Sequence, residues 1–196
     1  SCDAFIEKTV TSIPKPVADF QYSTITCSSQ AVQFTDISQT NGGSNIFTWE
    51  WIFGEPSSGA NNTSTLQNPS HVFDTAGTYQ VRLIVTNASN CRDTITLPVH
   101  IRQLPYAMFS ADTVCLGDPT QFNSNLSIPH ASGISSYSWN FGDGSPFGTL
   151  PNPTHTYATA GIFAVTLTIV NTNGCIKDTT RLVPVNPLPV PGFTFN

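Results

Sequence analysis

The chain has 196 residues, of which 10% are charged and 39% are hydrophobic, and its formal net charge is −5. It carries no cluster of Lys or Arg to neutralise a row of phosphates, which excludes nucleic acid as the partner. Its apolar runs are only as long as strands, far short of the ~20 residues that span a bilayer. The abundance of Thr, Ser, Asn, Val and Pro indicates strands joined by polar turns and excludes a helical bundle.

In chain order, the first strongly patterned segment is Trp49–Phe53, where aromatic residues occupy every second position. Such a stripe falls on one face of a strand. A sugar-binding platform also uses aromatic side chains, but a period of two is more typical of a packed core. Gly54–Pro56 then predicts a turn, which Ser57–Thr65 lengthens. Alternating apolar residues in Tyr79–Val85 predict a long strand with one buried face.

The same elements return in the same order in the second half of the chain. Three pairs of segments match: Trp51–Glu55 with Trp139–Asp143, Asn68–Phe73 with Asn152–Tyr157, and Thr75–Leu83 with Thr159–Leu167. In the second copy Gly142-Asp143-Gly144 predicts a tight reversal. The repeat therefore predicts two successive domains of one fold.

Three cysteines mark the repeat boundaries, because each stands 18 residues before a strand-opening Phe: Cys2 before Phe20, Cys91 before Phe109 and Cys175 before Phe193. We expect the end of a preceding module (1–15), domain 1 (16–103), domain 2 (104–187) and the start of a third module (188–196). The connection Arg102–Pro105 is short and contains a proline, which predicts domains arranged end to end.

Cys27 and Cys115 occupy a second repeated position, and the simplest pairs are Cys27 with Cys91 and Cys115 with Cys175. Cys2 is assigned to the preceding module rather than to an intermolecular bond. Each bond would close a loop of about 60 residues and add roughly 4 kcal/mol in the chain-entropy model. Disulfides persist in oxidising compartments, which predicts an exported protein. Its signal is expected upstream, since the chain's first ten residues carry charges.

The segment Trp139–Gly144 resembles the Trp-Asp-Phe-Gly-Asp-Gly hallmark of the PKD (polycystic kidney disease) domain family and departs from it at one position. Asn152–Tyr157 and the strand after it also match. The first copy departs more, at Ile52, Glu55 and Pro56. The resemblance implies an all-β chain of two tandem Ig-like β-sandwich domains. The cysteine-bearing variety is similar to modules of large bacterial cell-surface proteins, including gliding adhesins and cargo of the type IX secretion system.

Candidate chemical groups are few. His71 and His155 occupy one repeated position, which favours a role in a turn or in hydrogen bonding over a metal ligand or a general base. Asp112, Asp118 and Asp143 could offer oxygens to calcium, but six to eight are needed and no dense run supplies them, so roles in turns are favoured. The sequence contains none of the common catalytic or phosphate-binding motifs, and we expect no enzyme, no metal and no cofactor.

Four Asp-Thr pairs resemble a bacterial O-glycosylation sequon that is used on exported proteins, with acceptors at Thr75, Thr94, Thr113 and Thr179. The alternative, that Asp-Thr merely opens strands, stays open in a sequence so rich in Thr.

The resemblance implies a non-catalytic array that forms a stalk or spacer of an exported surface adhesin, with neighbouring modules as partners and a surface protein or polysaccharide as a possible ligand. Membrane insertion is not expected. The alternative is a pair of accessory ligand-binding modules in a secreted protease or glycosidase. The half-modules expected at both ends favour the stalk.

Overall fold

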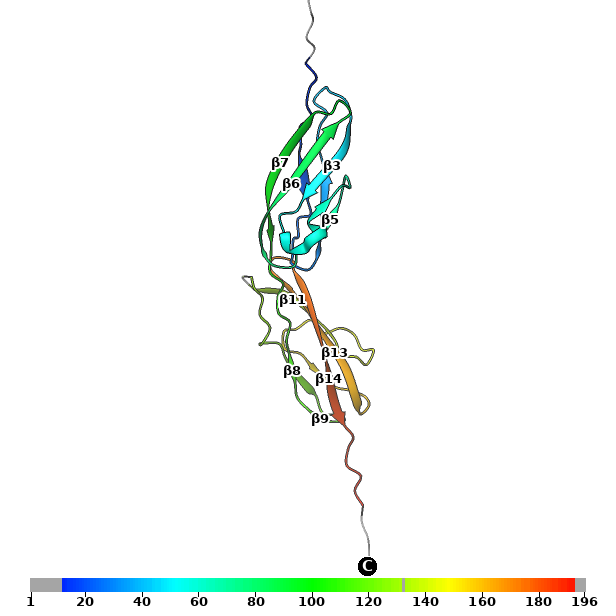
Figure 1. Cartoon of the computed structure of the whole chain (residues 1–196). Coiled ribbons are helices and arrows are strands. Elements are labelled where there is room, and N and C mark those ends of the chain that lie inside the picture. Colours follow the sequence, from blue (N-terminus) through cyan, green and yellow to red (C-terminus); the bar gives the residue numbers. More distant parts are fainter. Residues whose placement is uncertain (1–11, 132, 193–196) are drawn as a thin grey trace, which may run out of the picture. The chain divides into compact units, whose positions relative to one another are not determined.

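The computed structural model describes residues 12–131 and 133–192. The chain forms two compact units, Ser1–Ile101 and Arg102–Asn196, called domain 1 and domain 2 below (Figure 1). Cys2 and Phe193, on which the expected flanking modules depend, lie outside the described residues.

Domain 1 is built from two antiparallel sheets. The smaller sheet has the strand order β1-β2-β5, and the larger has the order β4-β3-β6-β7. The smaller sheet consists of β1 (Phe20–Tyr22), β2 (Ala31–Asp36) and β5 (Ser70–Val72). The larger consists of β4 (Thr63–Ser64), β3 (Ile46–Ile52), β6 (Gly77–Asn87) and β7 (Arg92–Ile101). A 3-10 helix, η1 (Pro56–Asn62), occupies the long turn after β3.

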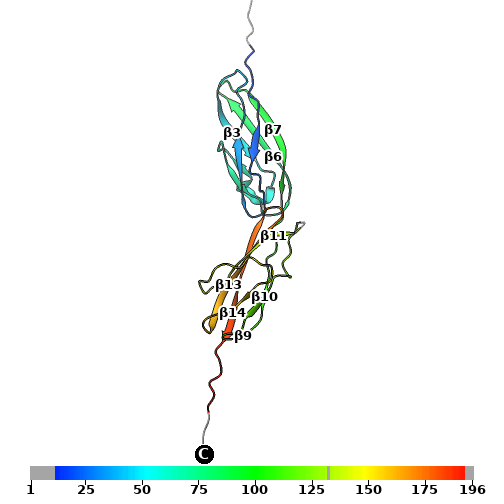
Figure 2. The ribbon, with the colours of Figure 1, turned by 180° about the vertical axis from the view of Figure 1, so that it is seen from behind.

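Among its described residues, domain 2 repeats this plan with two differences: it has no 3-10 helix, and its larger sheet has β9 beside the last long strand and no counterpart of β4 (Figure 2). Its smaller sheet has the order β12-β10-β8 and its larger sheet the order β11-β13-β14-β9. The smaller sheet consists of β8 (Ser110–Ala111), β10 (Thr120–Asn123) and β12 (Thr154–His155). The larger consists of β11 (Ile134–Asn140), β13 (Gly161–Asn171), β14 (Ile176–Asn186) and β9 (Val114–Cys115). The last pair, β9 with β14, is parallel.

The same aromatic cluster fills the core of each domain. Trp51 meets Phe20 and Phe34 with ring centroids 5.2 and 5.6 Å apart. Trp139 meets Phe109 and Phe122 at 5.1 and 5.4 Å. All six side chains are buried, and aromatic pairs in such geometry add about 0.5–1.5 kcal/mol each beyond the area that they bury.

The aromatic stripe of the sequence is confirmed as core packing. Trp51, Phe53, Trp139 and Phe141 are all buried, and Trp49, at the start of the first stripe, is half-buried against the same core. The indole N–H of Trp51 donates to the carbonyl of Leu66 at 2.9 Å, and that of Trp139 donates to Leu150 at the same distance. Each Trp therefore anchors the loop that follows its strand.

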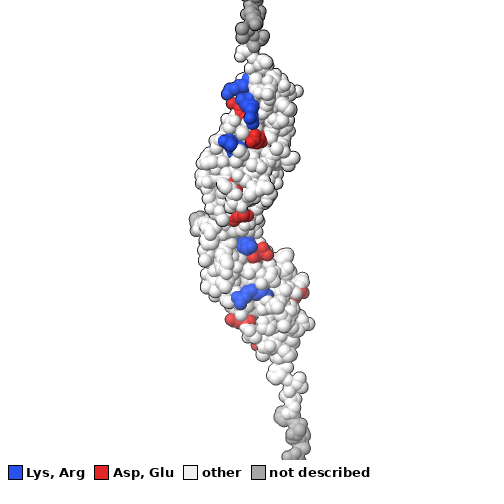
Figure 3. Space-filling model, in the orientation of Figure 1, with Lys and Arg blue, Asp and Glu red and all other residues white. Residues whose placement is uncertain are grey.

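The surface carries few charges. On the face shown in Figure 3, blue and red atoms lie scattered among uncharged ones. Two exposed ion pairs, Lys15 with Asp93 and Arg92 with Glu50, neutralise part of domain 1. Across residues 12–131 and 133–192, the structure has no helix of the length and apolarity that crossing a membrane requires.

Candidate functional site

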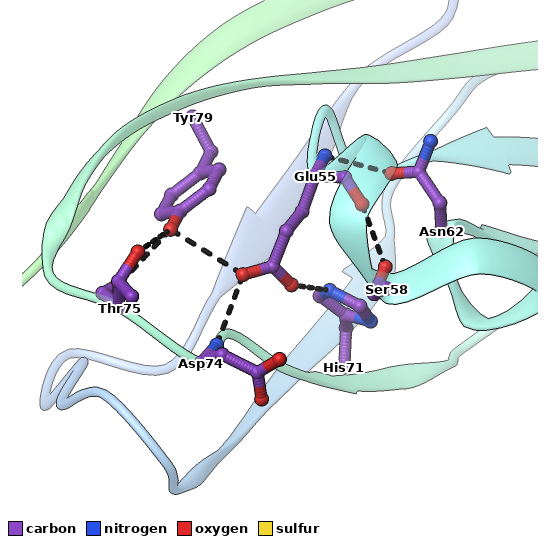
Figure 4. A network of polar contacts seen from close by, with 7 residues as sticks. All are labelled: Glu55, Ser58, Asn62, His71, Asp74, Thr75 and Tyr79. Atoms are coloured by element: carbon purple, nitrogen blue, oxygen red, sulfur yellow. Dashed lines mark hydrogen bonds and ion pairs between the residues drawn. The ribbon is translucent and has the colours of Figure 1, made fainter.

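A carboxylate and an imidazole form a buried pair in domain 1, just after β3 (Figure 4). Glu55 Oε2 lies 3.0 Å from Nε2 of His71, and both side chains are only 3% exposed. The His71 ring stacks on Phe53, with centroids 4.2 Å apart and planes 6° apart, and it meets Phe73 edge-on. The imidazole is thus fixed on two sides by rings and on a third by the carboxylate.

The remaining groups of Glu55 tie the surrounding loops together. Its Oε1 accepts hydrogen bonds from the backbone N–H of Asp74 at 2.9 Å and from the Tyr79 hydroxyl at 3.4 Å. Its backbone N–H donates to Asn62 Oδ1 at 2.7 Å, and its carbonyl accepts from Ser58 Oγ at 2.7 Å. These contacts join β3, η1 and the turn before β6.

Domain 2 contains the equivalent pair in a more open setting. His155 Nε2 lies 2.7 Å from Asp143 Oδ2, and the side chains are 15% and 18% exposed. The imidazole again stacks on an aromatic ring, that of Phe141, at 4.1 Å and 3°. The hydrogen-bonding role predicted for the repeated histidines is confirmed in both domains.

Both carboxylate oxygens of Asp143 accept hydrogen bonds, Oδ1 from Ser145 and Oδ2 from His155. Burial raises the pKa of this carboxyl, but hydrogen bonds from Ser145 and His155 outweigh burial and lower the pKa from 3.8 to about 2. The neighbouring Tyr157, buried and close to the Asp143 charge, has its pKa raised to about 12. The carboxylate therefore stays ionised and is held by its own domain, rather than being presented to a calcium ion.

Both pairs depend on a glycine that immediately precedes the carboxylate. Gly142 has a φ of +80°, and a Cβ there would lie 2.6 Å from the carbonyl oxygen of Ala164 on β13. Gly54 has a φ of +77° and would meet the carbonyl oxygen of Gln80 at 2.7 Å. Only glycine combines this backbone conformation with so close an approach to the neighbouring strand.

A polar hollow of about 550 Å³ lies beside the pair in domain 1. Its wall carries hydroxyl and amide groups from η1, β4 and β5, with one carboxylate: Phe53, Ser57, Ser58, Asn61, Thr63, Ser64, Ser70, His71, Val72 and Asp74. The insertion Ser57–Thr65 supplies half of this wall. Sequence reasoning identified the insertion but gave no sign that it encloses a hollow.

The expected disulfide pairs are wrong. Cys91 and Cys115 are free thiols, whereas Cys27 and Cys175 are disulfide-bonded, so neither Cys27–Cys91 nor Cys115–Cys175 is formed. Cys2 lies outside the described residues.

The reason is that each domain holds its two cysteines at opposite poles. In domain 1, Thr26 donates to the carbonyl of His100 near the end of β7, which places Cys27 there, whereas Cys91 precedes the first residue of that strand. Ten residues of strand separate the two places by about 30 Å. A disulfide needs Cα atoms within about 7 Å.

Domain 2 has the same arrangement. Cys115 on β9 lies opposite Asn186, the last residue of β14, in the β-sheet. Cys175 precedes Ile176, the first residue of β14. The strand of 11 residues between them spans more than about 30 Å. The linear spacing that identified equivalent cysteines did not reveal that they occupy opposite ends of one long strand.

A buried asparagine at each hairpin turn was missed by the sequence reasoning. Asn87 Oδ1 accepts from the backbone N–H groups of Ser89 and Cys91, and Asn171 Oδ1 does the same in domain 2. Their Nδ2 groups donate to the carbonyls of Pro14 and Pro129. The available signal was the Asn that stands four residues before both Cys91 and Cys175, because a buried Asn must satisfy its whole amide.

The four threonines in Asp-Thr pairs differ in access. Thr94 and Thr113 are exposed. Thr75 is exposed, but its hydroxyl lies 2.8 Å from that of Tyr79. Thr179 is half-buried opposite the core residue Leu167.

Of the three acids weighed for calcium, Asp112 and Asp118 are exposed, and Asp143 is held in the His155 pair. Within the described parts of the chain, no group of three or more His, Cys, Asp or Glu side chains is placed to hold a metal ion.

The model of the PKD domain family matches residues 14–101 and 102–185. These two matches cover most of the chain, which therefore belongs to the PKD domain family. PKD domains are non-catalytic adhesive or structural modules, typical of extracellular proteins and also found in secreted proteases.

Polycystin-1 from Homo sapiens is 37% identical over 112 residues, which is 54% of this chain and 2% of the human protein. The chain thus spans only a small part of that relative. Among solved structures, the PKD1 domain of the Vibrio cholerae metalloprotease PrtV is 27% identical with a TM-score of 0.38, covering 45% of this chain and 98% of that one. The PKD1 domain of Vibrio anguillarum Epp is 25% identical with a TM-score of 0.39, covering 46% and 96%.

Proposed function

We propose that this chain is a stretch of a non-catalytic array that forms a stalk or spacer of an exported surface adhesin. The observation that carries the proposal is the course of the chain through each domain. In domain 1 the chain enters beside the β6–β7 turn, where Pro14 accepts a hydrogen bond from Asn87. It leaves after Ile101, at the far end of β7. The points at which the chain enters and leaves domain 1 are therefore about 30 Å apart, one at each end of β7.

The ladder along the last strand suits this role. β6 and β7 pair from Gly77 opposite Ile101 to Thr86 opposite Arg92, and β13 and β14 pair over a similar length. A pull along the chain loads these hydrogen bonds together, in shear. The chain is also tied down where it enters domain 1, by Lys15 to Asp93 at 2.8 Å and by the backbone N–H of Ala18 to the same carboxylate at 2.9 Å.

The buried carboxylate–histidine pairs support a structural role rather than catalysis. The partners of Glu55 all belong to its own domain, and its side chain is almost wholly buried. A general acid or base has to reach a substrate proton within about 3 Å. In domain 2 the equivalent residues, Asp143 and His155, bond one another, and Ser145 donates two further hydrogen bonds to Asp143.

A swap in the parent protein tests the spacer role. Residues 14–185 are deleted, or are replaced by two unrelated PKD domains of equal length, and surface adhesion is measured together with surface display. A spacer predicts that deletion impairs adhesion while the replacement restores it. If the length-matched replacement is displayed on the surface but does not restore adhesion, the proposal is contradicted. That result would indicate that this chain itself binds the ligand.

A second candidate function, ligand binding by domain 1, is favoured by the polar hollow. Its hydroxyl and amide lining suits a small neutral glycan, the ligand class also expected of an accessory module in a secreted hydrolase. A glycan array with the wild type and Ser64→Ala decides between the functions. If the wild type binds a glycan and Ser64→Ala binds it more weakly, the second candidate function is supported. If the wild type binds no glycan, the result favours the spacer function.

Glycosylation is a further part of the proposal, because Thr94 and Thr113 are exposed acceptors in Asp-Thr pairs. Intact-mass measurement of the protein from its own host should show added hexose-containing mass, which Thr94→Ala and Thr113→Ala together should remove. A mass equal to that of the bare polypeptide would exclude the modification.

A further inference from the structure

Each domain carries one cysteine at the pole where the chain enters and one at the pole where it leaves. Cys91 and Cys175 lie at the hairpin turns, held by the Asn87 and Asn171 side chains. Asn87 binds the segment through which the chain enters domain 1, at Pro14. Asn171 binds Pro129, whose neighbours Ile128 and His130 bond the entry segment of domain 2 at Tyr106 and Leu104. We call this end the N-terminal pole of a domain.

The other two cysteines lie at the opposite end, the C-terminal pole. Cys115 lies opposite Asn186, the last residue of β14, in the β-sheet. Cys27 follows Thr26, whose hydroxyl binds the carbonyl of His100, one residue before β7 ends. A single domain therefore cannot close a disulfide between its own two cysteines. Each cysteine can bond only a cysteine that lies outside its domain, next to the pole at which it stands.

The bonding state of the four cysteines is consistent with this rule. Two of the four cysteines are disulfide-bonded: Cys175, at the N-terminal pole of domain 2, and Cys27, at the C-terminal pole of domain 1. Their equivalents, Cys91 and Cys115, are free and partly exposed thiols. Because the turns around Cys91 and Cys175 are the same in their hydrogen bonds, the difference does not come from the local fold.

We propose that Cys91 and Cys115 form disulfides with the modules that flank this stretch in the parent protein. Cys91 bonds the C-terminal-pole cysteine of the preceding module, and Cys115 bonds the N-terminal-pole cysteine of the following one. The inference rests on the proposed array. It gives the array a covalent staple at each junction in addition to the main chain.

The chemistry is that of oxidative folding during export. Two thiols give up two protons and two electrons to a protein disulfide, which is reduced to a dithiol as the S–S bond between modules forms. Such a bond limits bending and separation at a junction, and it keeps the array covalently continuous if the short connecting segment is cleaved by a protease.

Non-reducing peptide mapping tests the proposal in two samples. In the 196-residue chain, alkylation before reduction should label Cys91 and Cys115 and leave Cys27 and Cys175 unlabelled. In the exported parent protein, alkylation before reduction should no longer label Cys91 and Cys115. Each should appear in a linked peptide whose other half comes from outside residues 1–196 of the same molecule.

Alkylated Cys91 and Cys115 in the parent protein would overturn the proposal, as would a Cys27–Cys91 or Cys115–Cys175 peptide. Linkage to a second copy of the protein, seen as a dimer band that disappears on reduction, would overturn it too. None of these results bears on the swap of residues 14–185, so a failure of the staple is distinguishable from a failure of the spacer function.

A protease assay adds a mechanical readout. The parent protein and its Cys115→Ser variant are cut by limited proteolysis at the junction and run without reduction. The wild type should remain at full length on the gel until reductant is added, whereas the variant should fall apart at once. Identical release of pieces from both proteins would contradict the staple.

Discussion

The ionised Asp143 should make the stability of domain 2 depend on pH in acid. Its pKa is about 2 in the folded domain, against 3.8 as the ordinary value. Because the folded-state pKa is the lower one, the stabilisation is complete above about pH 4 and is lost as the pH falls through 2. A shift of this size corresponds to about 2 kcal/mol at neutral pH, and solvent screening of the partly exposed side chain makes that an upper value.

The informative variant is Asp143→Asn, which keeps the shape of the side chain and one of its two oxygen acceptors, replaces the other by an amide NH2, and removes the titration. At pH 7 the variant should be less stable than the wild type by about 1–2 kcal/mol. The two proteins should converge as the pH approaches 2. Asp118→Asn, at an exposed acid of the same domain, is the control and should match the wild type throughout.

Urea unfolding at a series of pH values, followed by hydrogen-exchange mass spectrometry, gives the free energy of unfolding for peptides of each domain separately. Peptides of domain 1 serve as an internal reference. A stability difference that stays constant from pH 7 to pH 2, or an Asp143→Asn protein as stable as the wild type at pH 7, would refute the reasoning.

Three further substitutions test the packing. Trp139→Ala should cost domain 2 about 3–5 kcal/mol in urea unfolding, because it empties the centre of the core, and a loss under 1 kcal/mol would contradict the assigned core. Gly142→Ala should lower the melting temperature of domain 2 far more than Gly144→Ala. Both have positive φ, but only the first Cβ meets a backbone oxygen, and equal shifts would contradict that contact. Glu55→Ala should destabilise domain 1 by about 1–3 kcal/mol, because it leaves the buried His71 ring without its hydrogen-bond partner, and an unchanged melting temperature would argue against the pair.

The sequence was sufficient to predict the fold and the two-domain organisation. A period-two stripe such as Trp49–Phe53 determines which face of a strand is buried, and the repeat shows that the same packing occurs twice. The hydrogen-bonding role of His71 and His155 also followed from the repeat. A residue that recurs at one position in both copies serves something that both domains need.

The disulfides could not be predicted from spacing, because equivalence between copies carries no information on where a position lies along a strand. Cys27 and Cys91 are separated by the full length of β7, and only the register of Thr26 with His100 reveals it. The hollow in domain 1 was hidden for a similar reason. It depends on Pro56–Asn62 folding as a 3-10 helix with Gly59 at φ +59°, ψ −123°, a local geometry that the composition of the insertion does not specify.

The length-matched swap of residues 14–185 in the parent protein tests the central claim most directly, with adhesion and surface display measured on the same cells. A spacer predicts normal display throughout, impaired adhesion after deletion, and recovery with two unrelated PKD domains. Normal display with adhesion that no unrelated pair of domains restores would contradict the account, and would place a ligand-binding surface within this chain.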